Sequence, residues 1–188
     1  MVPMAQLWLP ILLSAVFVFI ASSIIHMATP MHKADFRKMP GEDAILTQMR
    51  AQGLQPGSYM FPGAESMKDC GSPEMIEKFK RGPVGMMTVM PSGAPGMGKN
   101  LVQWFLFSVL VSAFVAHLAG QAFAPGAASK MVFHMSALAA VLGYATRPLP
   151  DSIWKGQPWS ITVKFVIDGV VYAAVTGLTF AWLWPAGV

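Results

Sequence analysis

Charged residues are absent from three long stretches of the chain, and these stretches are almost continuously apolar. No Lys, Arg, Asp or Glu occurs before Lys33, between Lys99 and Lys130, or after Asp168. A helix needs about 20 mostly apolar residues to cross the hydrocarbon core of a bilayer. The pattern therefore predicts helices that lie in lipid.

Four candidate membrane spans fall in or beside these stretches. They cover residues 7–27, 101–120, a segment centred on 131–146, and 161–184. The third is the weakest, because its uncharged part is short and it needs residues 127–130, with the Lys130 side chain reaching back to the interface. The first lacks a basic start and is too long for a cleaved signal, so we expect it to stay in the membrane.

The polar segment between the first two spans predicts a small folded cap. One helix is expected to open at residues 40–43 and to continue to Leu54, and a second is expected from Pro73, with Ser72 as N-cap and Gly82 just past the end. The segments 58–62 and 84–90 are typical of short strands, and 90–99 is typical of a Gly/Pro linker. Two strands alone are marginal in water, so the cap is expected to lean on the membrane, the helices or another subunit.

Together these elements predict an all-α membrane protein. We expect a four-transmembrane-helix bundle with a small α+β extramembrane cap between its first and second helices. The expected domains are the first transmembrane helix (1–28), the cap (29–99) and the remaining three helices (100–188).

Composition and charge agree with a membrane protein. Hydrophobic residues make up 54% of the chain and charged residues 12%, whereas an ordinary soluble domain has about 25% charged residues. The net charge of +4 is concentrated beside the spans, in the 28–100 and 147–160 loops. By the positive-inside rule, these two loops are cytoplasmic and both termini lie outside. We expect no nucleic-acid partner, because basic residues in these places set membrane orientation.

Small residues repeat every four positions along the second and fourth spans. Such residues let helices approach closely in lipid. This pattern favours packing inside a compact bundle, with a homodimer interface as the alternative. The stripe on the second span is Ser108, Ser112, Ala116 and Gly120, and that on the fourth is Gly169, Ala173, Gly177 and Ala181.

A polar stripe runs beside the small residues of the fourth span. It consists of Lys164, Asp168, Tyr172 and Thr176. Asp168 is the only acid inside a span, which makes it a candidate functional residue. The favoured alternative is a simple pair with Lys164, one helical turn away. His26 ends the first span, so we expect it on the same side of the membrane as Asp168.

The histidines suggest two candidate metal sites. His117 ends the second span and His134 begins the third, whereas His26 and His32 flank methionines whose thioethers suit Cu(I). The favoured alternative is that the imidazoles bond carbonyls or water and that the methionines fill irregular packing. A structural metal site normally has four ligands, and no cofactor is expected.

No enzymatic activity is predicted. The GxSxG, HExxH and CxxC motifs are absent. The single cysteine, Cys70, excludes an internal disulfide and has an acidic neighbour that disfavours a reactive thiolate.

Two segments, DSIWKGQPWSITVKFVIDGVVYAAVTGLTFAWLWP and HMATPMHKADFRKMPGEDA, resemble small bacterial inner-membrane proteins of no assigned activity. The resemblance implies a multi-pass topology in a bacterial inner membrane and transfers no functional residues. We therefore expect a non-catalytic accessory or assembly subunit that acts through protein contacts or as a homo-oligomer. The alternative is a small carrier or metal-handling protein that uses Asp168 and the histidines.

Overall fold

The computed structural model describes residues 1–94 and 96–187, and it divides into two compact units. The helical unit comprises Met1–Asp35, Gly96–Ser152 and Gln157–Val188. The cap comprises Phe36–Pro95 and Ile153–Gly156. Residues 29–35, assigned to the cap from sequence, thus pack with the helices. Pro95 of the expected linker and Val188 of the expected C-terminal domain lie outside the described residues.

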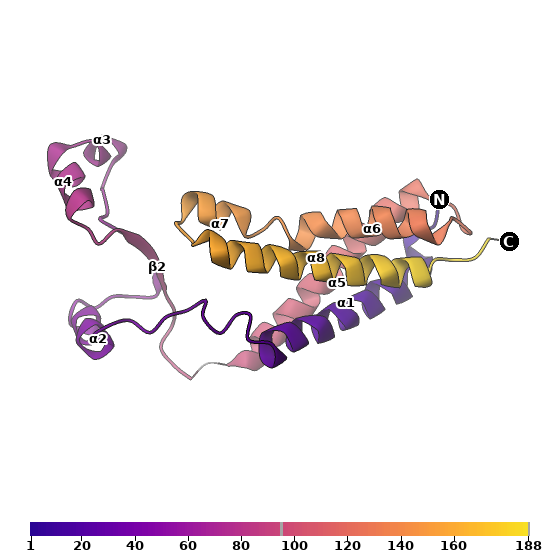
Figure 1. Ribbon diagram of the computed structural model, residues 1–188, viewed down its shortest axis with the longest axis horizontal. Coiled ribbons are helices and arrows are strands. Elements are labelled where there is room, and N and C mark those ends of the chain that lie inside the picture. The colour runs from indigo at the N-terminus through magenta and orange to yellow at the C-terminus, as the bar shows by residue number, and fades with distance from the viewer. Residues whose placement is uncertain (95, 188) are drawn as a thin grey trace. The chain divides into compact units, whose positions relative to one another are not determined.

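Four long helices form the helical unit (Figure 1). They are α1 (Trp8–Ser23), α5 (Met97–Ala122), α6 (Ser129–Tyr144) and α8 (Trp159–Trp182). A π-helical turn, Ile24–Ala28, continues α1, and the short helix α7 (Leu149–Trp154) precedes α8. Helix α1 packs on α5 and α8, and α6 packs on the same two helices. The four helices therefore surround a common core.

The segments before α1 and after α8 lie at the same end of this unit (Figure 1). The backbone N–H of Val2 donates to the carbonyl of Gly120 at 2.8 Å, near the end of α5. In the opposite direction, the N–H of Gly126, between α5 and α6, donates to the carbonyl of Pro185 at 2.8 Å. These bonds tie the two terminal segments to the α5–α6 connection.

Among the described residues, three helices are long and apolar enough to cross a membrane. They are Trp8–Ala28, Met97–Ala122 and Trp159–Trp182. The expected third span is not confirmed, because α6 has 16 residues, about 24 Å of helix, against the ~30 Å of a hydrocarbon core. Helix α5 also begins at Met97 rather than at the expected Leu101.

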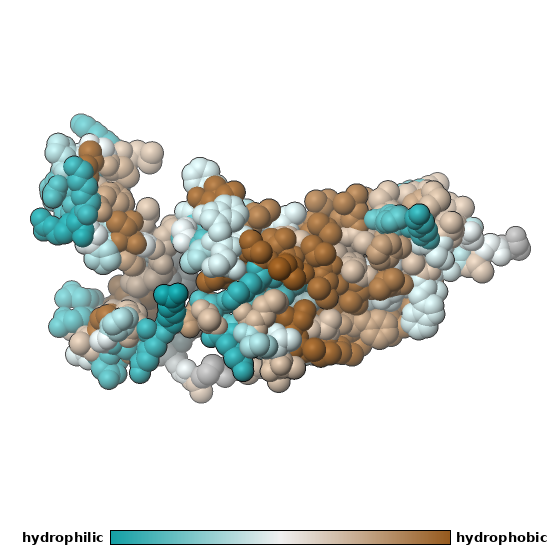
Figure 2. Space-filling view, viewed as in Figure 1, coloured by the Kyte–Doolittle hydropathy of each residue, from teal (hydrophilic) through white to brown (hydrophobic). Residues whose placement is uncertain are grey.

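The outer surface of the helical unit is apolar, whereas its interior contains many small and hydroxyl-bearing residues. Helix α5 shows this most clearly: Ser108, Ser112 and Ala116 are fully buried. Its large apolar residues point outward instead, at 49–63% exposure: Leu106, Leu110, Phe114 and Leu118. Figure 2 shows hydrophobic residues spread over the face of this unit in view. Outward-facing leucine with inward-facing serine is the arrangement expected when lipid, not water, surrounds the helices.

The small-residue stripe of α8 packs on α6. A Cβ added at Gly169 would lie 2.4 Å from the Cα of Ala145, just past the end of α6. One added at Gly177 would lie 2.8 Å from the Cβ of Ala137. Ala173, between these glycines, is 1% exposed. These three residues therefore allow two helices of one chain to approach closely.

The cap contains the two expected strands and both expected helices. Strands β1 (Gly57–Phe61) and β2 (Gly85–Val89) pair antiparallel, with Tyr59 opposite Met87. Helices α2 (Glu42–Ala51), α3 (Met67–Cys70) and α4 (Pro73–Arg81) complete it, and α3 was not expected. The Ser72 side chain accepts from the N–H of Met75, and Gly82 ends α4 with a φ of 62°, as the capping pattern predicted. The α+β description of the cap is therefore correct.

Candidate metal centre

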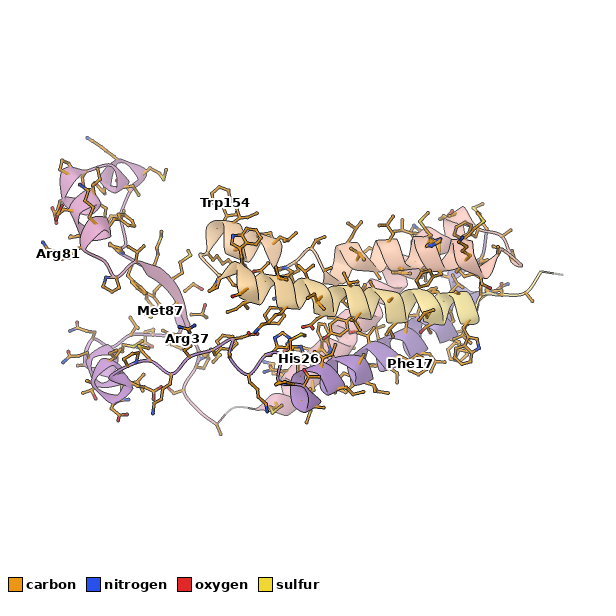
Figure 3. All side chains as sticks on the ribbon, in the orientation of Figure 1. Phe17, His26, Arg37, Arg81, Met87 and Trp154 are labelled. Carbon is orange, nitrogen blue, oxygen red and sulfur yellow. The ribbon has the colours of Figure 1, made fainter. Side chains whose placement is uncertain are left out.

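Three separate segments bring polar side chains to the end of the helical unit where α1 finishes. The π-helical turn carries His26, the segment after it carries His32 and Asp35, and α8 carries Lys164 and Asp168. Figure 3 shows His26 at this end of α1, beyond Phe17 on the same helix. The site therefore depends on the packing of α1 against α8.

Local hydrogen bonds shape the segment after α1. The Thr29 hydroxyl donates to the carbonyl of Ile25 at 2.6 Å and thereby binds a carbonyl that the ending helix leaves free. The N–H of Asp35 then donates to the carbonyl of His32 at 3.1 Å. This tight turn brings the two side chains to the same side of the segment.

His26, His32 and Asp168 bring three potential ligand atoms together within 4.8 Å of one another. The Nε2 of His32 lies 2.9 Å from Oδ2 of Asp168, and the Nε2 of His26 lies 3.7 Å from the same oxygen. Two atoms that bind one tetrahedral zinc ion at about 2.1 Å lie about 3.4 Å apart. The two distances from the histidines to Asp168 therefore lie on either side of this value.

The closest two of these atoms, His32 Nε2 and Asp168 Oδ2, are close but poorly aligned for a hydrogen bond. His32 Nε2 and both carboxylate oxygens of Asp168 are buried and lack a hydrogen-bond partner among the described residues. Imidazole and carboxylate can each donate an electron pair to a metal ion, so an ion between them would satisfy these buried atoms.

Asp35 fixes the ring of His32 from the other side. His32 Nδ1 lies 2.6 Å from Oδ2 of Asp35, and a carboxylate can only accept, so Nδ1 carries the proton. In the neutral ring Nε2 is then free to bind an ion. A carboxylate behind a ligating histidine is the usual second layer of a protein metal site.

Lys164 completes this second layer. Its ammonium donates to Oδ1 of Asp35, whose side chain is only 1% exposed. The hydrogen bond from Lys164 holds the pKa of Asp35 below its usual value, against the opposing effect of burial. Asp35 is therefore a charged carboxylate at neutral pH, and the lysine compensates that charge.

Aromatic side chains surround the two imidazoles. The Phe165 ring lies 5.0 Å from the His32 ring, and the two histidine rings lie 4.4 Å apart. The Tyr172 hydroxyl lies 3.4 Å from Nε2 of His26. The His26 side chain is 41% exposed, whereas that of Asp168 is 2% exposed. The cluster is thus closed on the Asp168 side and open on the His26 side.

The structure brings together only some of the residues singled out from sequence. His26, His32, Asp168 and Tyr172 meet, but Lys164 pairs with Asp35 and not with Asp168, which was its expected partner. The Thr176 hydroxyl donates to the carbonyl of Tyr172 in its own helix. The remaining candidates also lie outside the cluster: His117 and His134 are exposed and do not belong to the group, and Met27 is 79% exposed.

Sequence reasoning missed Asp35 and Phe165. The spacing His32-x-x-Asp35 directly after a span was an available signal, because a tight turn brings such residues together. Nothing local indicates that Asp35 binds Lys164, since the two are 129 positions apart.

No protein-family model, curated protein or solved structure matches this chain. The resemblance to small bacterial inner-membrane proteins therefore stays a prediction.

Proposed function

We propose that this chain is a multi-pass membrane protein that binds one divalent transition-metal ion through His26, His32 and Asp168. The observation that carries the proposal is the close, unaligned approach of His32 Nε2 to Asp168 Oδ2, at 2.9 Å. Imidazole and carboxylate together suit zinc, iron, cobalt and nickel. The outward position of Met27 disfavours Cu(I), which prefers thioethers.

The membrane part of the proposal has four spans, with α6 as the third. The outer face of α6 carries large apolar residues in the same pattern as its neighbours: Met131, Met135, Leu138 and Leu142, at 37–66% exposure. A helix with so apolar an outer face is expected to lie in the lipid bilayer beside α5 and α8. Tilt, local thinning of the bilayer and the reach of Lys130 to the interface offset its shortness.

The orientation follows from the basic residues beside the helices. Lys33 and Lys164 flank the metal site, and the positive-inside rule places such residues in the cytoplasm. In a bacterial inner membrane, the ion would thus bind near the cytoplasmic surface, with both termini outside. The proposed role is to hold the ion, and no reaction is part of it.

Titration of the full-length protein with metal tests the proposal. The protein is purified in detergent, stripped with a chelator and titrated with Zn²⁺ and Co²⁺. We expect one ion per chain, with Asp168→Asn and His32→Ala each weakening binding by at least the roughly 10–100-fold that loss of a second-layer partner costs. The matched control is the His117→Ala/His134→Ala variant, which removes two histidines outside the site.

Two results would overturn the proposal. One is a wild-type protein that binds neither ion. The other is a control variant that loses as much affinity as Asp168→Asn. Circular dichroism and size-exclusion chromatography of each variant separate loss of ligands from loss of fold.

The cap favours a second candidate function, that of an accessory or assembly subunit. Its only buried large apolar side chain among the described residues is Met75, whereas Phe36, Met67 and Met90 are 77–89% exposed. Such side chains fit a protein partner. Crosslinking and blue-native gels should then give a defined complex, and a strictly monomeric protein without partners would exclude this role.

A further inference from the structure

We propose that the metal site accepts a small anion as an additional ligand and that the Tyr172 hydroxyl donates a hydrogen bond to it. This inference rests on the proposed metal binding and concerns what the bound ion contacts next. Three features of the site support it: the number of ligands, the charge, and the position of Tyr172.

The number of ligands leaves a coordination position open. Among the described residues, the group of histidines and acids contains only His26, His32 and Asp168. Zinc and its neighbours take four ligands or more, and sites with three protein ligands keep a position for water or a small molecule. Two histidines and one carboxylate with open positions are also a known arrangement for ferrous iron.

The open position faces the accessible side of the site. Asp168 and His32 are buried, at 2% and 12% side-chain exposure, whereas His26 is 41% exposed. A molecule from outside would therefore reach the ion past the His26 ring. It has no such path from the Asp168 side, which packs into the helical unit.

The charge of the site favours an anion. Two neutral imidazoles and one carboxylate leave a bound divalent ion with a net charge of about +1. Asp35 and Lys164 add nothing to this sum, because their opposite charges pair with each other. A small anion with an oxygen or nitrogen donor, such as a carboxylate or azide, would neutralise the site.

Tyr172 is placed to bind that anion. Its hydroxyl lies 3.4 Å from His26 Nε2, and this is the only hydrogen bond that the described residues give it. Once an ion occupies Nε2, that nitrogen no longer accepts a proton. The tyrosine is 4% exposed, so its freed O–H needs a new acceptor. An anion bound to the metal beside His26 supplies one.

Visible spectroscopy of the cobalt-loaded protein tests the inference. Full-length protein in detergent is loaded with Co²⁺, and its visible bands are followed while azide is added. We expect a saturable change in the bands, because azide alters the coordination of the ion. Tyr172→Phe should keep its Co²⁺ affinity and bind azide about tenfold more weakly, as loss of one hydrogen bond predicts. Tyr144→Phe removes a neighbouring buried phenol and should behave as wild type.

The outcomes separate this inference from the proposed function. If no cobalt spectrum appears, metal binding itself is refuted. A normal cobalt spectrum that azide leaves unchanged refutes the open position and leaves metal binding intact. Equal azide affinity in the wild type and Tyr172→Phe refutes the role of the tyrosine. The wild-type titration decides the open position even if the Tyr172→Phe variant does not fold.

Discussion

At the scale of the residue, the site shows how one side chain orients another that is closer to the proposed ion. Asp35 makes no contact with the proposed metal, yet it decides which nitrogen of His32 carries the proton. Lys164 in turn keeps Asp35 charged. The hydrogen bond to the far side of a metal-binding side chain orients the atom that binds the metal.

This dependence predicts the effect of Asp35→Asn. The amide keeps the shape of the side chain but removes the negative charge that both Lys164 and His32 contact. We expect Co²⁺ affinity to fall about 10–100-fold, the usual cost of losing a second-layer carboxylate. Competitive titration against a chelator of known affinity measures it. Asp43→Asn, which neutralises an exposed acid of the cap, is the control, and equal losses in the two variants would contradict the role given to Asp35.

At the scale of the element, close contact between α8 and α6 holds the bundle together. Glycine and alanine occur where the two helices touch, and larger residues occupy the outer faces. Serines connect α1 to α5, since Ser14 donates to the Ser112 hydroxyl at 2.8 Å inside the bundle. In lipid, helix association depends on such packing and hydrogen bonds, because apolar surfaces gain little from leaving lipid for protein.

Two glycine substitutions with opposite expected effects test this packing. Gly169→Ala would force a methyl group against the backbone of Ala145, which cannot move aside as a flexible side chain could. We expect a loss of about 1–3 kcal/mol in the free energy of unfolding. Gly98→Ala in α5 meets nothing within 4 Å and should be neutral or stabilising by about 0.5–1 kcal/mol. Unfolding in detergent, followed by tryptophan fluorescence, measures both, and equal stability of the two variants would contradict the close contact.

Much of the secondary structure could be predicted from sequence, because local signals determine it. Ser72, Pro73 and Gly82 mark the ends of α4 through caps that need no distant partner. The length of α6 was overestimated, because hydropathy does not show where a helix ends. The meeting of His32 with Asp168 could not be predicted, since it depends on how α1 crosses α8 and on the turn at Asp35. Counting the spans predicted only that His26 and Asp168 lie toward the same side of the membrane.

At the scale of the whole molecule, the proposed orientation places the cap in the cytoplasm, and the single cysteine tests this. Cys70 is exposed in the cap. A maleimide that cannot cross the inner membrane should leave Cys70 unlabelled in intact cells and label it after the membrane is broken. A Cys70→Ser/Gly187→Cys variant moves the thiol to the C-terminal segment and should react in intact cells. Labelling of Cys70 without breaking the membrane would reverse the orientation.

The proposed ligands lie far apart in the sequence, and this has a consequence for the order of synthesis. His26 and His32 leave the ribosome well before Asp168, which belongs to α8. A nascent protein has the first two donors long before it has the third, so firm capture of an ion must wait for α8. A metal ion held there would link α1 to α8, and its retention would mark chains in which both of these helices have been inserted.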